Sequence, residues 1–412
     1  MSEASLITSS TSKLEGLCSG RNLLVIQDTT EINLQSHSGR LNPSNGLGPV
    51  GNNTDVGFFL HPSLVLDQDN LTPVGFSSID IYHRDWDKGD KHSRGYNNLP
   101  ITEKESYKWI RNSQVSKQTL SKANSITIIQ DREGDIYEQF CHIPDSRTHL
   151  LIRVRGNRRL ANIPNKLYEY LEQQEVSGTY KLEVDSTRRT GRVARNALMQ
   201  IKFKEVEIKR PETACKNVPK SLKLYVVEAK ESNSTVPKGE KAICWRILTT
   251  HTVETLTQAK LMVTWYSHRW FIEQIFRLIK KKGFAIENSE LETGWALRKL
   301  TVLVLQAVLK VCQLMIAYGK EDGQPIKEVF EQQEIECLEK LNQKLEGCTQ
   351  KIKNPYPRDQ LSWATWIIAR LAGWSGYKSQ RRPGVITLKN GLERFNSIFD
   401  GWSLSLEDVY TR

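Results

Sequence analysis

The chain has 412 residues, of which 38% are hydrophobic and 25% charged, so it can bury globular cores in about two or three domains. Its 58 Lys and Arg residues against 47 Asp and Glu residues give a formal net charge of +11 and a pI near 9.2, which favours a nucleic-acid partner without proving one. The seven cysteines show no C-x-x-C spacing and an odd total, which argues against a zinc site and a disulfide framework and favours a reducing cytoplasm.

Two short apolar runs, residues 23–28 and 126–131, are predicted to be buried central strands, and they end in Asp28 and Asp131. Between them, residues 58–66 and 74–82 are plausible strands and residues 103–121 have helical composition. A single aspartate after a strand most often forms a turn or caps a helix. Ligand sites in α/β folds also lie at the carboxyl ends of strands, so both interpretations stay open for either residue alone.

A β-rich region follows. Residues 151–155 alternate apolar and basic side chains, which would place Arg153 on a cationic strand face. Residues 179–184, 200–208 and 222–228 alternate apolar and polar side chains, as an antiparallel sheet with one solvated face does. Trp245 lies in a further probable strand, where it would be a core residue.

Residues 266–280 are predicted to form an amphipathic helix. Its polar stripe holds Tyr266, Arg269, Glu273 and Lys280, Trp270 lies beside the stripe, and the apolar side chains project from the other face. Most amphipathic helices collect charges on their solvated face without any function, and the stripe alone would favour that interpretation. The combination with two aspartates at strand ends favours an active site that works on nucleic acid.

The chain shows no sign of export or membrane insertion. Its first residues lack the basic start and apolar stretch of a secretory signal. The most hydrophobic segment, residues 300–318, is interrupted by Gln306, Lys310 and Gln313, which favours a buried core helix over a membrane span. We therefore expect a cytoplasmic, nucleoid-associated protein of bacterial type with no membrane partner.

The C-terminal part is predicted to be helical. Residues 325–346 have the composition of a connecting helix, and the prolines at 355 and 357 mark a boundary. The segment beyond them is rich in large apolar side chains, among them Trp363, Trp366 and Trp374, which could form a dimer interface or could dock on the core of the same chain.

Asp28, Asp131 and Glu273 together suit a pair of hard divalent cations. Carboxylate oxygens are the ligands that Mg²⁺ prefers. Two such ions roughly 3.5 to 4 Å apart clamp the attacking and leaving oxygens of an in-line phosphoryl displacement. We expect these three residues to be both the catalytic residues and the metal ligands, with Mg²⁺, or Mn²⁺ in its place, as the cofactor.

The signature segment resembles that of DDE transposases of the insertion-sequence-four type. Their pattern Y-x(2)-R-x(3)-E-x(6)-K, known as YREK, is matched at all four positions by Tyr266, Arg269, Glu273 and Lys280. The segments around Asp28 and Asp131 also look like the family's segments around its catalytic aspartates. The resemblance implies that Tyr266, Arg269 and Lys280 contact DNA phosphates, and that Trp245, Trp270 and Arg153 match further DNA-binding positions. For Trp245, this DNA contact and a core role in its strand are about equally favoured.

The resemblance also implies an α/β fold, with a ribonuclease H-like catalytic core in which a mixed sheet is flanked by helices. The expected parts are residues 20–156 and 245–320 for the two parts of the core, 157–244 for a β-rich insertion, 321–357 for a linker helix and 358–412 for a C-terminal helical dimerisation domain. The family's N-terminal domain for recognising transposon ends is expected to be absent, because only 27 residues precede Asp28.

Three functions are open at this point. The first is a homodimeric transposase that cuts double-stranded DNA at transposon ends and joins the ends to target DNA, which is DNA recombination by metal-dependent phosphoryl transfer. The second is a truncated, non-transposing chain that binds full-length transposase and inhibits it. The third is another ribonuclease H-like nuclease, which the complete four-residue signature makes less favoured.

Overall fold

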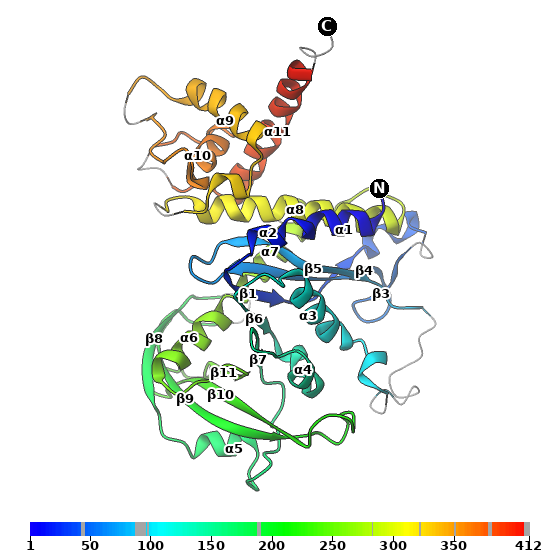
Figure 1. Ribbon diagram of the computed structural model, residues 1–412, viewed down its shortest axis with the longest axis vertical. Coiled ribbons are helices and arrows are strands. Elements are labelled where there is room, and N and C mark those ends of the chain that lie inside the picture. Colours follow the sequence, from blue (N-terminus) through cyan, green and yellow to red (C-terminus); the bar gives the residue numbers. More distant parts are fainter. Residues whose placement is uncertain are drawn as a thin grey trace.

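One mixed sheet runs through the part of the chain that the computed structural model describes, and helices lie on both of its faces (Figure 1). The described residues are 1–42, 46–86, 96, 99–187, 191–281, 283–320, 323–349, 352–377 and 381–407. Their strands form an 11-stranded sheet in the order β2-β4-β1-β6-β7-β11-β10-β9-β8, and β3 and β5 pair with β4. Residue 321, the expected start of the linker helix, lies outside the described residues. This mixed sheet flanked by helices is the α/β, ribonuclease H-like arrangement that the sequence predicts.

Three parallel strands form the centre of the sheet: β1 (Asn22–Gln27), β6 (Ser125–Gln130) and β7 (Thr148–Arg153). Their side chains are buried on both faces, because Leu24 and Ile26 belong to one hydrophobic core and the alternating residues belong to a second. A strand covered on both faces needs a continuous apolar run, which is why these strands could be predicted from the sequence.

Antiparallel strands extend the sheet on the side of β1. The long strand β4 (Asp55–Asp67) pairs with β1 and with β5 (Pro73–Tyr82), and both correspond to strands predicted from the sequence. The short strands β2 (Thr30–Asn33) and β3 (Gly48–Val50) also pair with β4. β1 and β2 pair with β4 in one register, Gln27 opposite Ser63 and Thr30 opposite Leu60, so the chain continues along β4 past Asp28.

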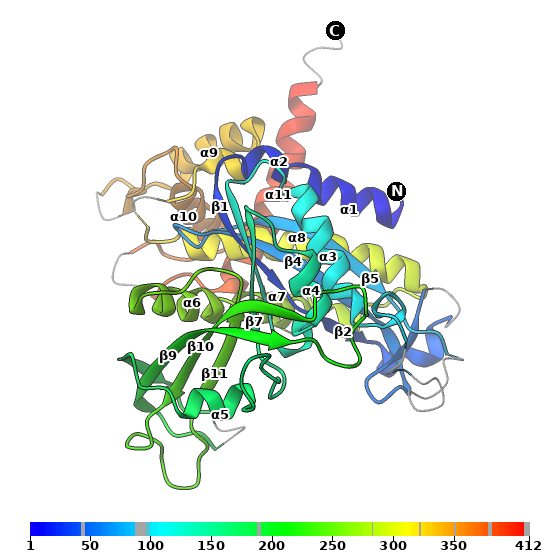
Figure 2. The same cartoon turned by 60° about the horizontal axis from the view of Figure 1, so that its bottom comes forward.

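The β-rich region continues the same sheet on the other side. It consists of β8 (Gly178–Val184), β9 (Arg195–Lys209), β10 (Ser221–Glu231) and β11 (Cys244–Thr249), all paired antiparallel. β11 pairs antiparallel with β7 and so joins this region to the parallel centre. The turn of the long β9–β10 hairpin lies beside the helix at residues 137–142 (Figure 2), where the Tyr137 hydroxyl donates to the Pro219 carbonyl at 2.9 Å. Burial alternates along β8, as its sequence pattern predicts.

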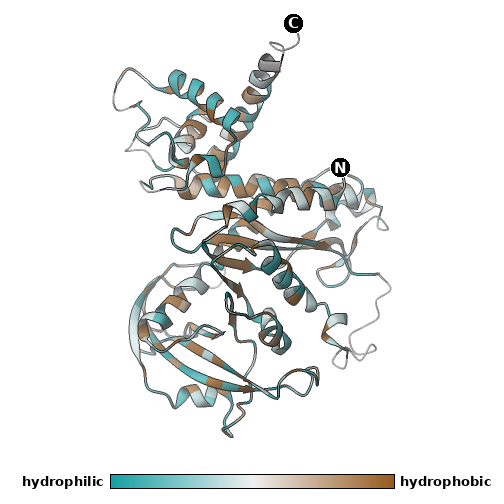
Figure 3. Cartoon of the chain, in the orientation of Figure 1, coloured by the Kyte–Doolittle hydropathy of each residue, from teal (hydrophilic) through white to brown (hydrophobic). Residues whose placement is uncertain are grey.

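Each face of the sheet has its own helices and its own core. On one face, α3 (Tyr107–Thr119), α4 (Tyr137–His142) and α5 (Leu167–Glu172) pack on the second core. On the other, α6 (Leu256–Ser267), α7 (Trp270–Lys280) and α8 (Gly294–Ala317) pack on the first. The central strands are the apolar segments between these helical layers (Figure 3).

The prediction of one continuous helix over residues 266–280 is wrong. α6 ends at Ser267 and α7 begins at Trp270, so Tyr266 and Glu273 lie on different helices. At the junction, the backbone N–H groups of His268 and Arg269 bond to carbonyls three residues earlier, which is a tighter winding than that of an α-helix. Periodicity over such a short window does not reveal a local change of winding.

Helix α8 joins the core to the C-terminal helices α9 (Gln332–Leu345), α10 (Leu361–Leu371) and α11 (Val385–Glu407). Its middle part packs in the first core and its last part in a third core with α9, α10 and α11. Among the described residues, α8 is the one helix long and apolar enough to cross a membrane, and 61% of its most apolar stretch is buried inside the molecule. That burial fits the predicted core helix.

Two N-terminal helices that the sequence did not predict, α1 (Glu3–Ser12) and α2 (Leu14–Leu17), pack against the core. α1 lies along α8 and β5 (Figure 1). The buried guanidinium of Arg298, on α8, donates to both carboxylate oxygens of Glu3 at 2.7 Å and to the carbonyl of Ile81 at 2.7 Å. This ion pair fastens the N-terminus to the core.

Replacing Glu3 by Gln is expected to lower the free energy of unfolding by about 3 kcal/mol, because it leaves a buried guanidinium without its countercharge. Urea denaturation measures the change. Glu15→Gln is the matched control, since Glu15 pairs with Lys122 at the surface, with more than half of each side chain exposed. That variant should lose less than about 1 kcal/mol. Equal losses in the two variants would show that α1 is not fastened by this pair.

Candidate active site

Asp28 and Asp131 lie beside each other at the carboxyl ends of two adjacent strands. The parallel register pairs Ile26 with Ile129, so each aspartate follows two residues later at the same edge of the sheet. Each carboxylate is held by its own turn. The N–H of Thr29 donates to Asp28 Oδ1 at 2.8 Å, and the N–H of Glu133 donates to Asp131 Oδ1 at 2.8 Å. The strands therefore aim both carboxylates at one position.

Glu273 reaches this position from the first turn of α7 and is joined to Asp28 through Arg269. The Arg269 guanidinium donates to Asp28 Oδ2 at 2.7 Å and also pairs with Glu273 Oε1. Arg269 occupies the N-cap position of α7, one turn before Glu273. Asp28 and Glu273, which lie far apart in the chain, thus share one guanidinium.

The environment of Asp28 opposes its negative charge. Burial, helped by the neighbouring carboxylates of Asp131 and Glu273, raises the pKa of Asp28 to about 7 against the lowering effect of Arg269 and the Thr29 N–H. Carboxylates with raised pKa values that face a cleft are typical of functional sites, although structural ion pairs also produce such shifts. One arginine thus offsets part of the charge of three converging carboxylates.

The donor set suits a divalent cation, but its present arrangement is an ion pair. Among the described residues, no three His, Cys, Asp or Glu side chains stand close enough together to hold a metal ion. Arg269 bridges two of the carboxylates instead. Oxygen donors of this kind fit Mg²⁺ and Mn²⁺. A cation that is shared by Asp28 and Glu273 would have to displace the guanidinium from between them.

A cavity of about 430 Å³ opens beside the aspartates. Lys108, on α3, lines it and is nearly buried, and its ammonium donates to the Tyr82 hydroxyl at 2.9 Å. Burial lowers the pKa of Lys108, against the raising effect of Glu105, Glu133 and Asp28. Lys108 could not be predicted from the sequence, since one lysine in a polar helix forms no pattern. The other lining residues are Asp28, Thr29, Thr30, Glu31, Phe59, Arg84, Glu105, Asp131 and Glu133.

Three of the expected DNA-binding residues lie together where β7, β11 and α6 meet. The rings of Trp245 and Tyr266 are T-shaped with centroids 5.7 Å apart, and Arg153 donates to the Cys244 carbonyl at 3.1 Å. Trp245 is half-buried, whereas Tyr266 is 4% exposed. Burial raises the pKa of Tyr266, and the charges of Arg269 and Arg153 oppose that rise. Tyr266 is thus packed in the first hydrophobic core.

The two remaining expected residues lie on α7. Trp270 is 45% exposed and stacks on Phe271 with ring centroids 4.4 Å apart, so an indole face is open to solvent. Lys280 lies 3.6 Å from Glu287, whose carboxylate also accepts from the N–H of Asn33, the last residue of β2. Lys280 is therefore tied to the strand that follows Asp28.

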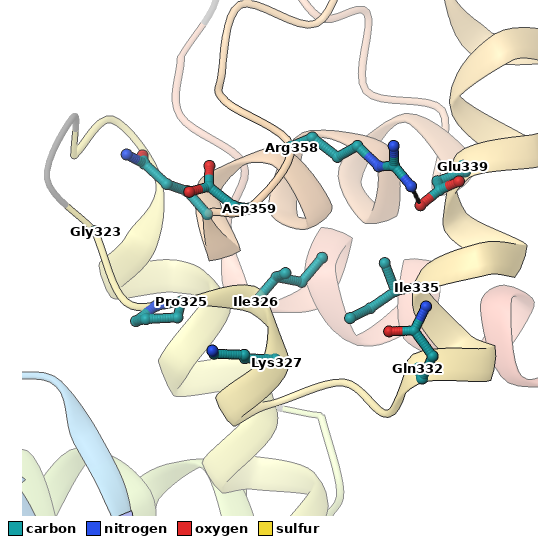
Figure 4. A pocket seen from close by; sticks show the side chains of 10 residues that line it. Gly323, Pro325, Ile326, Lys327, Gln332, Ile335, Glu339, Arg358 and Asp359 are labelled. Atoms are coloured by element: carbon teal, nitrogen blue, oxygen red, sulfur yellow. Dashed lines mark hydrogen bonds and ion pairs between the residues drawn. The ribbon is translucent and has the colours of Figure 1, made fainter.

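A larger cavity, of about 880 Å³, lies among the C-terminal segments (Figure 4). Arg358 and Glu339 form an ion pair at its side, and Ile326 and Ile335 supply its apolar wall. None of its lining residues belongs to the carboxylate site. The larger of these two cavities is therefore not the one beside the carboxylates.

Residues 113–309 match a family model that is described as a transposase DDE domain. The match contains Asp131, Glu273 and the whole segment from Tyr266 to Lys280, and Asp28 precedes it. It runs from within α3 through the β-rich region to the middle of α8.

Proposed function

We propose that this protein is a transposase that cuts double-stranded DNA at the ends of a mobile element and joins the freed 3′-hydroxyl to target DNA. The observation that carries the proposal is the meeting of Asp28 and Asp131, at adjacent strand ends, with Glu273 of α7. The transposase DDE domain match over residues 113–309 supports it. The signature segment supports assignment to the insertion-sequence-four type.

Asp28, Asp131 and Glu273 would hold two divalent cations, Mg²⁺ or Mn²⁺. When bound, such ions stabilise the charge that develops on a phosphate and position the attacking and leaving oxygens. The residues of the chain fix the geometry, because two carboxylates stand on rigid strands and the third on a packed helix. Rigid mounting matters because a displacement of about 1 Å can cost 10²-fold in rate.

Cationic and aromatic groups around the carboxylates would hold the DNA. Arg269 offers a planar fork for phosphate oxygens and Lys280 a point charge. The open face of Trp270 suits stacking of a nucleotide base, and the half-buried Trp245 beside Arg153 is a second candidate for such a contact. The Tyr266 ring packs against Trp245, and its hydroxyl would contact a DNA phosphate. We also propose that the chain works as a homodimer through its C-terminal helices.

The proposal is tested with the purified full chain, Mg²⁺ and a plasmid that carries the gene with its native flanking DNA. We expect breaks at fixed positions in the flanks, 3′-hydroxyl ends at the cuts, and junctions between those ends and new target DNA. Light scattering of the protein–DNA complex should give the mass of the DNA plus two chains. Equal cutting of plasmids without the flanks would identify a general nuclease and refute the transposase proposal.

The apparent affinity for Mn²⁺ is expected to depend on pH, because the pKa of Asp28 is raised to about 7. A carboxyl group must lose its proton to bind a cation, so affinity should fall about tenfold per pH unit below pH 7 and level off above it. Asp28→Asn should remove this dependence in calorimetric titrations. The stability of the metal-free chain should depend on pH in the opposite direction. Because the pKa of Asp28 is raised on folding, it increases the free energy of unfolding at low pH, and this contribution is lost as the pH rises through about 7.

A further inference from the structure

A buried glutamine precedes each of the two aspartates. Gln27 ends β1 and Gln130 ends β6, and neither side chain is exposed to solvent. They follow the registered pair Ile26 and Ile129, so they lie opposite each other across the parallel strands. Since side chains alternate along a strand, both amides point to the face covered by α3 and α4, away from the face of Ile26.

The two amides bond to each other and to three further elements. Gln130 Nε2 donates to Gln27 Oε1 at 2.6 Å and to Ser113 Oγ, on α3, at 3.2 Å. Gln27 Nε2 donates to Ser63 Oγ, on β4, at 3.0 Å. Gln139 Nε2, on α4, donates to Gln130 Oε1. One hydrogen-bond network therefore fixes the last residues of β1 and β6 relative to each other and to their surroundings.

The loop after Asp131 is built onto the same network. A Cβ atom at Gly134 would lie 2.8 Å from Gln130 Cβ and would collide with the Gln130 amide oxygen, so only glycine fits there. Gly134 belongs to the turn that begins at Asp131 and holds its carboxylate. The position of the Gln130 amide is therefore coupled to the turn that orients Asp131.

We propose that Gln27 and Gln130 are positioning residues that set the separation of Asp28 and Asp131; we call this pair the amide clamp. The inference rests on the proposed function, because it assigns the clamp a role in the carboxylate site. Apolar side chains could fill this part of the interior, as they do in the second core on the same face, without burying polar groups. Directional hydrogen bonds define a distance between strand ends that apolar contacts leave adjustable.

The test compares two double variants of the full chain by Mn²⁺ binding, with Mn²⁺ alone as the probe. Gln27→Leu with Gln130→Leu removes the clamp while keeping the bulk of both side chains. Ser77→Ala with Ser116→Ala is the matched control. It removes another buried hydrogen bond between the sheet and α3, 2.9 Å long and three residues along the helix from Ser113.

We expect the clamp variant to bind Mn²⁺ about tenfold more weakly, the lower end of the range for residues that orient metal ligands, and the control to bind like the original chain. Unchanged affinity in the clamp variant, or an equal loss in the control, overturns the proposal. If the clamp variant does not fold, Gly134→Ala replaces it, since it displaces Gln130 without removing an amide. Unchanged affinity in that folded variant also overturns the proposal.

A reference titration separates this inference from the proposed function. Asp28→Asn and Asp131→Asn should each weaken Mn²⁺ binding more than the clamp variant does. If both bind Mn²⁺ as tightly as the original chain, the proposed metal site is wrong and the clamp has no site to position. If they bind weakly and the clamp variant does not, the metal site stands and the clamp alone is refuted.

Discussion

Replacing Asp28 or Asp131 by Asn, or Glu273 by Gln, is expected to slow Mg²⁺-dependent DNA cleavage by roughly 10³-fold or more, with the fold intact. Each change removes one charged oxygen from a site whose proposed work is charge stabilisation, and each amide keeps nearly the shape of the acid. The substitution at Asp28 also removes a buried carboxylate with a raised pKa, so it should not destabilise the chain at neutral pH. Single-turnover cleavage of the flanked plasmid measures the rates.

The control for these variants is Glu212→Gln, which changes one exposed carboxylate outside the site. It should cleave at the original rate. DNA affinity, measured by fluorescence anisotropy, should stay within a few-fold in the three site variants, because the proposed phosphate contacts come from other side chains. Full cleavage by any one of the three variants would remove that residue from the proposed catalytic set.

Arg269→Gln is expected to have opposite effects on metal binding and on catalysis. The guanidinium now bridges Asp28 and Glu273, so its removal frees two carboxylates and should tighten Mn²⁺ binding several-fold at a pH where Asp28 is ionised in both proteins. The same change removes a proposed phosphate contact, so cleavage should fall about 100-fold. Calorimetry with Mn²⁺ and single-turnover cleavage measure the two effects.

Arg277→Gln is the matched control, because Arg277 is exposed on the same helix two turns beyond Arg269. It should leave Mn²⁺ affinity and the cleavage rate unchanged.

Since Arg269 lowers the pKa of Asp28, the Arg269 variant should also reach constant Mn²⁺ affinity at a higher pH than the original chain. Weaker Mn²⁺ binding in the Arg269 variant, at every pH, would show that the arginine supports the cation and does not compete with it.

Local patterns in the sequence identified the central strands and the polar segment of α7. β1 and β6 are buried on both faces, and such strands must be apolar throughout, so the aspartates at their ends stand out. The break at His268 could not be read in the same way, because a change from four-residue to three-residue hydrogen bonding moves Tyr266 out of the stripe without altering the residue pattern.

Features that depend on distant partners were not predictable. The pairing of β7 with β11, which makes the β-rich region part of the central sheet, is a matter of register between segments about 100 residues apart. The Arg269 bridge and the burial of Lys108 likewise depend on which elements meet in space. One feature of the sequence does point to the buried amide network. The sequence Ile-Gln-Asp occurs at the end of both strands, and the repeated glutamine is the amide clamp.

The sharing of α8 between two cores has a practical consequence for dissecting the molecule. Its residues Val302 and Leu305 are packed under the sheet, while Leu314 and Ala317, farther along the same helix, are enclosed by the C-terminal helices. A fragment that ends after α8 would expose Leu314 and Ala317 to water. A fragment that begins after α8 would lose the side chains on which α9, α10 and α11 pack. The C-terminal helices therefore cannot be moved to another protein unless the second half of α8 is redesigned as well.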